Sequence, residues 1–150
     1  MTKILKLAAF DNADLEVVSA HCQDAVLKSS EIDFDPSNKR LLLPVNRFAW
    51  EAPGARRWFF KTYERRRCVL HIDLAKSIRS KGLNKNDDDE VRSILSIDFH
   101  SEEDEEGSAG TLEIIFSGGA SLLVEVEALE MRLTDLGATW AANSKPKHKT

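Results

Sequence analysis

The chain has 150 residues, of which 42% are hydrophobic and 31% are charged, and its formal net charge is −4 at pH 7. These values are typical of one soluble globular domain and exclude a fibrous or largely disordered chain. No apolar run is long enough for a secretory signal or a membrane span, so we expect no membrane partner. Because the two cysteines are far apart and form no CxxC motif, we expect a reducing, cytoplasmic location.

The N-terminal part of the chain predicts a strand followed by a helix. Residues 3–10 have the apolar density of a strand, and Asp11 then stands in the position of a helix N-cap, with Asp14 in the first turn. Apolar side chains next recur at helical spacing, at Leu15, Val18, Cys22 and Ala25. We therefore expect an amphipathic helix over residues 12–25.

The hydrophobic period then changes to two residues. Ile32 and Phe34 alternate with acidic residues, and the DPSN sequence that follows has the composition of a turn. The pattern predicts a return strand over residues 39–46. Since Pro44 has no amide proton, we expect this strand to lie at an edge or to carry a bulge there.

Residues 47–67, called the basic-aromatic stretch below, interleave cationic side chains with aromatic rings. Pro53 and Gly54 mark a loop within them. Charge elsewhere is also arranged in blocks, acidic at 86–90 and 102–106 and basic at the C-terminus. Blocks of opposite sign in one small domain can neutralise each other across its surface.

Two strands with clean alternation come next, at residues 66–79 and 91–100. The side chains expected to face inward are Cys68, Leu70, Ile72 and Leu74 in the first strand and Leu95, Ile97 and Phe99 in the second. We expect the two strands to pair as a hairpin around the 80–90 loop. That pairing would bring four polar side chains together on the outer face: His71, Asp73, Asp98 and His100.

The C-terminal part predicts a hairpin and a closing helix. Gly118 and Gly119 separate two apolar strands, and glycine tolerates the positive φ of tight hairpin turns. Leu129, Leu133 and Leu136 then recur at helical spacing, with Gly137 in the position of a C-cap.

These elements predict an α+β fold. We expect a curved, mostly antiparallel sheet or small barrel, with an N-terminal helix and a C-terminal capping helix. The arrangement resembles the pleckstrin-homology-like barrel, a comparison that carries no information about a ligand. Residues 1–141 are expected to form a single globular domain, and residues 142–150 a basic, flexible tail.

Most of the chain also resembles one family of small bacterial proteins. The resemblance lies in LKLAAFDNADLEVVSAHCQDAVLK, LLPVNRFAWE, RRRCVLHIDLAKSIRSKGL and GTLEIIFSGGASLLVEVEALEMRLTDLGATWAANSKP, and it spans residues 3–147. The family is catalogued as a domain of unknown function, DUF2948, and is typical of alphaproteobacteria. It implies a bacterial, cytoplasmic, single-domain protein and brings no established activity, ligand or catalytic residue.

The basic-aromatic stretch is the strongest candidate for a binding site. Arginine and aromatic side chains together are typical of the anchors of protein interfaces. The same two residue types also bind phosphates and stack on unpaired bases. A structural interpretation remains open as well, with the aromatic rings partly buried and the arginines paired with the acidic runs. The candidate binding residues are Arg47, Trp50, Arg56, Arg57, Trp58, Phe59, Lys61, Tyr63, Arg65, Arg66 and Arg67.

Catalysis is the less favoured interpretation. The sequence contains no G-x-x-x-x-G-K-[ST], G-x-G-x-x-G, G-x-S-x-G or H-E-x-x-H motif, so we expect neither an enzyme nor a cofactor. The one alternative is a metal or acid–base site formed by His71, Asp73, Asp98 and His100. Cys22 and Cys68 lie on predicted apolar faces and are expected in the core.

We therefore expect a small cytoplasmic binding or adaptor module with a protein partner. RNA or single-stranded DNA is the alternative partner, and binding to either would fall steeply with salt. The strand edge at Pro44 and the aromatic cluster also offer surfaces on which a second copy could form a homodimer.

Overall fold

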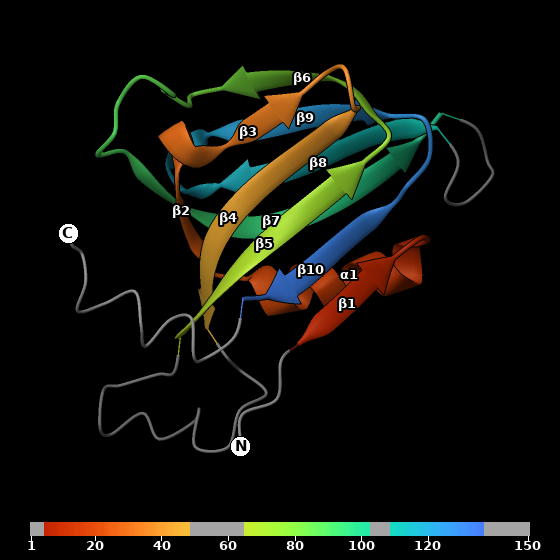
Figure 1. Ribbon diagram of the computed structural model, residues 1–150, viewed down its shortest axis with the longest axis horizontal. Helices are drawn as coiled ribbons and strands as arrows, with labels where there is room; N and C mark the ends of the chain where they lie inside the picture. Colours follow the sequence, from red (N-terminus) through yellow and green to blue (C-terminus); the bar gives the residue numbers. More distant parts are fainter. Residues whose placement is uncertain (1–4, 49–64, 103–108, 137–150) are drawn as a thin grey trace.

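The structure is a computed structural model that describes residues 5–48, 65–102 and 109–136. These residues form a 10-stranded antiparallel sheet and one α-helix (Figure 1). The elements are β1 (Lys6–Ala9), α1 (Asn12–Cys22), β2 (Val26–Lys28), η1 (Ser29–Glu31), β3 (Asp33–Asp35), β4 (Arg40–Phe48), β5 (Arg65–Asp73), β6 (Ala75–Lys81), β7 (Val91–Ser101), β8 (Gly110–Phe116), η3 (Ser117–Gly119), β9 (Ser121–Val126) and β10 (Met131–Asp135).

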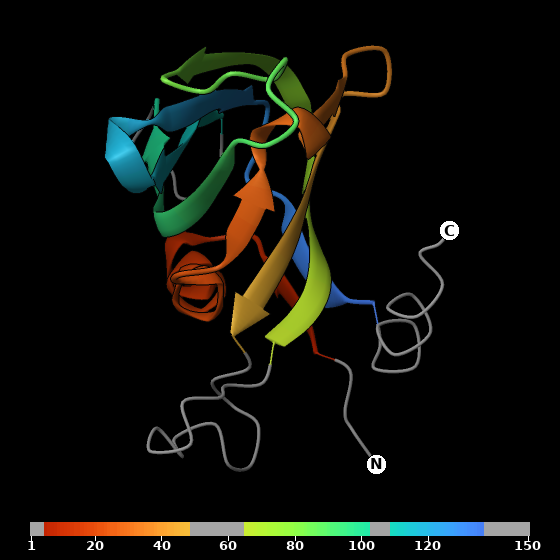
Figure 2. The ribbon, with the colours of Figure 1, turned by 90° about the vertical axis from the view of Figure 1, so that its left-hand side faces the viewer.

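The sheet bends back on itself and forms two layers (Figure 2). The strand order is β1-β10-β5-β4-β2-β7-β8-β9-β6, and β3 pairs with β4 on the same side as β2, farther along the strand. Strands β5 and β6 are separated only by Leu74, whose φ of 60° turns the chain from one layer into the other. Strands β9 and β10 make the same passage, because β9 pairs with β6 and β10 with β5. This confirms the curved, mostly antiparallel sheet.

The core lies between the two layers, where each strand contributes alternate side chains. Leu41, Leu43 and Val45 of β4 are buried, as are Leu112, Ile114 and Phe116 of β8. Since successive side chains of a strand point to opposite faces, the residues between them face outward. The predicted inward positions Cys68, Leu70 and Ile72 of β5 are confirmed.

Helix α1 closes one end of the space between the layers (Figure 2). Asp11 caps it as predicted, with Oδ1 accepting the Asp14 amide at 2.8 Å. Leu15, Val18 and Cys22 are buried, and the Ser19 hydroxyl accepts the Ile97 amide of β7 at 3.0 Å. The N-terminal helix is therefore confirmed, and it ends at Cys22.

The predicted C-terminal helix is wrong for the residues that the structure describes. Met131–Asp135 form β10, which pairs with β1 and β5. Leu129, Met131 and Leu133 are all buried, a period of two residues that the helical stripe of leucines concealed. Residues 137–150 lie outside the described residues, and so does the expected tail.

The predicted hairpin between residues 66–79 and 91–100 is also wrong. Strand β5 pairs with β4 and β10, and β6 pairs with β9, whereas β7 pairs with β2 and β8. The bend at Leu74 redirects the chain, so sequence neighbours do not become sheet neighbours. A register shift between Ile94 and Ser96 turns Leu95 outward and places Ile94 in the core.

The predicted glycine turn agrees with the structure, whereas the strand of Pro44 is an interior strand without a bulge, contrary to expectation. Gly118 and Gly119 have φ of 75° and 78° between β8 and β9. Pro44 falls between the part of β4 that pairs with β3, at residues 40–42, and Asn46, which pairs with Val26 of β2. Among the described strands, neither β3 nor β2 pairs with Pro44 on that side of β4, which suits a residue without an amide proton.

Candidate interaction surface

The outward-facing side of β10, β5 and β4, called the outer face below, is the side of the sheet shown toward the viewer in Figure 1. The strand register aligns its side chains in rows. One row runs Lys6, Thr134, Val69, Pro44 and the next runs Ala8, Arg132, His71, Leu42. No described helix or strand covers this face. The middle of the outer face holds half-buried apolar side chains, and cationic side chains lie around them.

Asp73 is the centre of a charged cluster on this face. Arg132 donates from Nη2 to Asp73 Oδ2, and His71 Nε2 lies 3.2 Å from Asp73 Oδ1. Arg40 Nε lies 3.8 Å from the same oxygen. Partial burial raises the pKa of Asp73, but the hydrogen bond from Arg132 and the charges of His71 and Arg132 outweigh it, so the net pKa is lowered. The carboxylate therefore stays ionised and holds three cationic or basic groups together.

A second charged cluster lies inside the protein, at the end of the sheet where β4 and β5 leave it. Arg47 donates from Nε to Asp135 Oδ1 and from Nη2 to Asp135 Oδ2, each at 3.0 Å. The Leu5 amide donates to Oδ2 at 2.9 Å, and Arg66 Nη1 lies 3.6 Å from that oxygen. The Cys68 thiol donates to Oδ1 at 3.0 Å. The Asp135 carboxylate thus accepts hydrogen bonds from three groups and forms an ion pair with a fourth, Arg66.

This environment changes the pKa of both acidic groups. Burial raises the pKa of Asp135. Hydrogen bonds from Arg47, Cys68 and the Leu5 amide lower it by more, so the net pKa is below its ordinary value. Burial raises the pKa of the Cys68 thiol, and the neighbouring Asp135 carboxylate raises it again. Burial likewise raises the pKa of Cys22 to about 12. Both cysteines are buried core thiols, as predicted.

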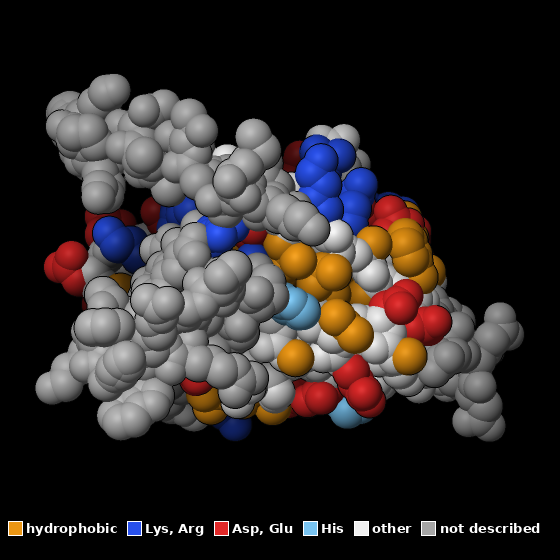
Figure 3. Space-filling view, turned by 90° about the horizontal axis from the view of Figure 1, so that it is seen from below, with side chains coloured by type: hydrophobic (Ala, Val, Ile, Leu, Met, Phe, Trp, Pro, Cys, Tyr) orange, Lys and Arg blue, Asp and Glu red, His pale blue; other side chains and the backbone are white. Residues whose placement is uncertain are grey.

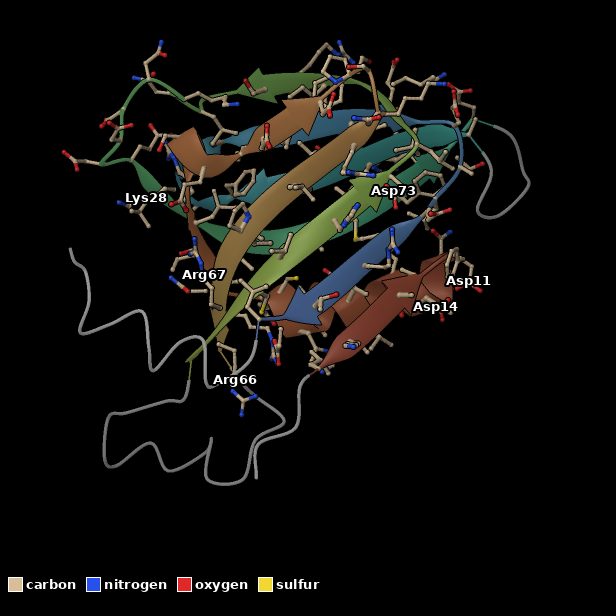
Figure 4. All side chains as sticks on the ribbon, viewed as in Figure 1. Asp11, Asp14, Lys28, Arg66, Arg67 and Asp73 are labelled. Atoms are coloured by element: carbon tan, nitrogen blue, oxygen red, sulfur yellow. The ribbon has the colours of Figure 1, made fainter. Side chains whose placement is uncertain are left out.

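The structure describes the side chains of three of the predicted binding residues, Arg47, Arg66 and Arg67. Arg47 is fully buried and Arg66 nearly so, and both contact Asp135, so neither guanidinium is presented to a partner in this structure. Arg67 is half-buried and pairs with Glu31 at 3.2 Å. Figure 4 shows Arg67 and Lys28 toward the same border of the outer face. The others lie outside the residues whose side chains are described: Trp50, Arg56, Arg57, Trp58, Phe59, Lys61, Tyr63 and Arg65.

The predicted metal or acid–base cluster does not form. His71 and Asp73 lie on β5, whereas Asp98 and His100 lie on β7, and β4 and β2 separate these strands in the sheet. His100 Nε2 instead lies 3.3 Å from Glu113 Oε1 of β8. Within residues 5–48, 65–102 and 109–136, no group of three or more His, Cys, Asp or Glu side chains is placed to hold a metal ion. The cluster was predicted from a pairing of β5 with β7, and these two strands do not pair.

Three charged residues of these clusters were missed from the sequence. Arg40 and Arg132 belong to strands whose register the sequence did not reveal. Asp135 continues the buried row of Leu129, Met131 and Leu133, so a period-two interpretation would have placed a carboxylate in the core. A charged residue in a buried row needs a partner, and that signal would have pointed to Arg47.

The end of the molecule closed by α1 has a different character. Figure 3 shows hydrophobic side chains grouped there, with acidic side chains along their border. Phe10 and Val17 are exposed, and Asp11 and Asp14 lie in the first turn region of the helix (Figure 4).

The chain matches the family model described as protein of unknown function (DUF2948) over residues 5–148. The chain therefore belongs to this family, which confirms the resemblance seen in its sequence. Comparison with curated proteins and with solved structures gives no match. Among the described residues, no helix is both long and apolar enough to cross a membrane.

Proposed function

We propose that this DUF2948 protein is a binding module that contacts an acidic protein partner through its outer face and the adjoining basic-aromatic stretch. The observation that supports the proposal is the composition of the outer face. Apolar side chains occupy its middle, and arginine, lysine and histidine surround them. We propose no catalytic role for the cluster around Asp73.

The middle of the outer face has the character of an interface core. Leu42, Pro44 and Val69 are adjacent in the register and are only partly buried, although no described element covers them. Burying apolar area releases about 25 cal/mol per Å². A partner that covers these three side chains would therefore gain free energy that the isolated protein does not realise.

The rim favours a protein over a nucleic acid. Arg132 and Arg40 share the Asp73 carboxylate, and Arg67 pairs with Glu31. Nucleic-acid affinity comes largely from protein cations that displace the counterions condensed on the phosphate backbone, and these arginines already have carboxylate partners. A protein surface can instead extend such pairs into networks of charge, which gives specificity.

The type of barrel and the cellular location of the protein are also part of what we propose. We propose that the curved sheet is a pleckstrin-homology-like barrel whose open end is closed by α1, and that the protein works in the bacterial cytoplasm. The cysteines are consistent with this location, because both are reduced and buried. The fold comparison itself says nothing about the ligand.

The test is affinity capture from native cytoplasm with the wild-type protein and two variants, each with and without nuclease. Arg67→Glu combined with Arg132→Glu reverses two charges at the rim of the outer face. Lys76→Glu is the matched control, because Lys76 is exposed on β6 in the other layer. We expect the wild type and the control to retain the same partner after nuclease treatment and the double variant to lose it.

Two results would overturn the proposal. A partner retained equally by the double variant would place the contact elsewhere. Partners that disappear on nuclease treatment, with nucleic acid in the untreated sample, would support the RNA-binding alternative. Thermal unfolding of each variant shows whether a lost partner reflects a lost fold.

A further inference from the structure

Helix α1 carries apolar side chains on two opposite faces, and the described residues cover only one of them. The covered face consists of the three buried residues of the helix, Leu15, Val18 and Cys22. Ala13, Val17 and Ala20 also recur at helical spacing, on the opposite side, and all three are exposed. A surface helix normally carries charged or polar side chains at such positions. This outward side is therefore an apolar helix face without a described partner.

Two exposed side chains beside the helix enlarge this apolar area. Phe10 immediately precedes the N-cap residue and is 54% exposed. Leu95 lies two residues before Ile97, whose amide donates to the Ser19 hydroxyl of α1 at 3.0 Å. Figure 3 shows hydrophobic side chains grouped at this end of the molecule. These two side chains and the three outward residues of the helix, called the α1 face below, are Phe10, Ala13, Val17, Ala20 and Leu95.

The charges around the α1 face are acidic. Residues 10–25 contain four carboxylates and neither lysine nor arginine. These carboxylates belong to Asp11, Asp14, Glu16 and Asp24. Lys6 of β1 lies on the outer face instead, and Arg92 of β7 donates to the carbonyls of Ser117 and Gly82. The negative charge around the helix is therefore not balanced by the cations of these two neighbouring strands.

Charge and shape together define what fits the α1 face. A second copy of the same face would bring two acidic borders together, which is unfavourable across an interface. Ala13 and Ala20 are small, so another helix can approach the axis of α1 closely. The two alanines are about 10 Å apart along that axis, which is about two turns of a partner helix. A helix with an apolar stripe and flanking lysine or arginine therefore complements both the stripe and its border.

We propose that the α1 face binds a cationic amphipathic helix of a partner protein. The apolar stripe of that helix covers Val17 and the neighbouring exposed side chains. Its cations lie beside Asp11 and Asp14 at one end of α1, which Figure 4 labels, and beside Asp24 at the other. The binding free energy comes from the apolar area buried, and the carboxylates select a cationic partner over an acidic one. The inference does not depend on the function proposed for the outer face, which involves different residues.

The test uses the synthetic peptide Ac-KKALKKALKKALKK-NH₂, whose alanines and leucines form one stripe on a helix, titrated into the full chain. Binding is measured by fluorescence anisotropy of the labelled peptide, and the backbone amides of the protein are followed by NMR. We expect saturable binding, with the largest changes of chemical shift at Ala13, Val17 and Ala20. A peptide of the same composition, reordered so that no stripe forms, should bind about tenfold more weakly because it covers less apolar area.

Variants of the protein separate the α1 face from general attraction to acidic residues. Val17→Gln combined with Ala20→Gln should weaken binding of the striped peptide about tenfold. Val91→Gln is the matched control, because Val91 is 53% exposed, against 47% for Val17, and follows the acidic run 86–90. The control should change the affinity less than about twofold. All three sites are exposed and glutamine is a good helix former, so the fold should be kept, and circular dichroism checks this.

Several outcomes contradict the proposal directly. Absence of saturable binding to the wild-type protein at millimolar peptide is the first. Equal binding of the reordered peptide would show that charge alone attracts it. An equal loss of affinity in the Val91 control, or shift changes centred on residues 86–91, would place the contact at the acidic run. If the double variant unfolds, the reordered peptide and the shift changes still decide the outcome.

Two other occupants of the α1 face are distinguished without any peptide. A second copy on this face would make the amide signal of Val17 depend on the concentration of the protein alone. Binding of the chain's own basic end would make the same signal shift when Lys145, Lys147 and Lys149 are all replaced by glutamine in the full chain. Either result would overturn the proposal, because the face would then belong to this chain and not to a partner protein.

Discussion

Arg47 and Asp135 form a two-point hydrogen-bonded ion pair that is inaccessible to solvent on both sides, with N–O distances of 3.0 Å. The pair joins β4 to β10 across β5, since Arg47 pairs with Arg66 in the register and Asp135 with Cys68. It lies where the chain leaves β4 and returns in β5. The base of the basic-aromatic stretch is thus fixed by a buried contact.

Removing one partner of this pair is expected to destabilise the protein strongly. Asp135→Asn keeps the shape of the side chain but removes the carboxylate that pairs with the buried Arg47 guanidinium. Such a loss typically costs about 3–5 kcal/mol of unfolding free energy. Urea denaturation of the variant and the wild type measures the difference.

A double substitution is the control for that prediction. Arg47→Met combined with Asp135→Leu removes both charges of this pair, whereas Asp135→Asn leaves Arg47 charged. The double variant should be more stable than Asp135→Asn alone. If Asp135→Asn changes the unfolding free energy by less than about 1 kcal/mol, the ion pair does not carry the stability assigned to it.

The stability of the protein should fall with acidity. Asp135 and Asp73 both have a pKa lowered in the folded protein, relative to an ordinary value of about 3.9 in an unfolded chain. The unfolded state therefore binds protons first as the pH falls. The stabilisation is complete above the unfolded pKa and is lost as the pH falls through the folded pKa values.

Urea unfolding between pH 7 and pH 2 measures this dependence. We expect a nearly constant contribution from these groups above about pH 5 and a decline below about pH 4. Asp135→Asn should show a shallower decline over the same range, because one of the two groups no longer titrates. An identical pH profile in the variant would contradict the lowered pKa of Asp135.

The local elements could be predicted from the sequence, whereas the pairing of strands could not. Asp11 capping α1 and Gly118 in the β8–β9 turn each act within a few residues of their own position, so their signals are readable. The pairing of Ile72 with Met131 joins distant parts of the chain, and many registers satisfy the same alternation. Leu74 has a left-handed φ, and the bend at this residue carries the chain from one layer to the other. Leucine rarely adopts such a φ, so its presence in the sequence does not indicate the bend.

The same division holds for the candidate site. The basic-aromatic composition of residues 47–67 was evident, but composition does not distinguish a buried arginine from an exposed one. Arg47 is buried in an ion pair with Asp135 of β10, and the leucine spacing predicted a helix where β10 lies. The predicted cluster of His71 and His100 was also wrong because of strand pairing. It required β5 to pair with β7, which the bend at Leu74 prevents.

The two cysteines should be unreactive in the folded protein. Burial raises the pKa of Cys22 to about 12, and the pKa of Cys68 is raised by burial and by the Asp135 carboxylate. Since the thiolate is the reactive form, neither should react with a disulfide reagent such as DTNB at pH 8. Both should react after addition of 6 M guanidinium chloride. Rapid reaction of one thiol in the native protein would show that its segment opens locally.

The register shift in β7 gives a prediction that separates two adjacent residues. Ile94 is 0% exposed and Leu95 is 48% exposed, although simple alternation from Ile97 and Phe99 places Leu95 in the core. Ile94→Ala should therefore lower the unfolding free energy by about 2–5 kcal/mol, through lost burial and the cavity left behind. Leu95→Ala should change it by less than about 0.5 kcal/mol, as for other surface substitutions. Urea denaturation of the two variants, compared at the same m-value, tests both. If Leu95→Ala were the more damaging change, β7 would lack the shift, and Leu95 rather than Ile94 would lie in the core.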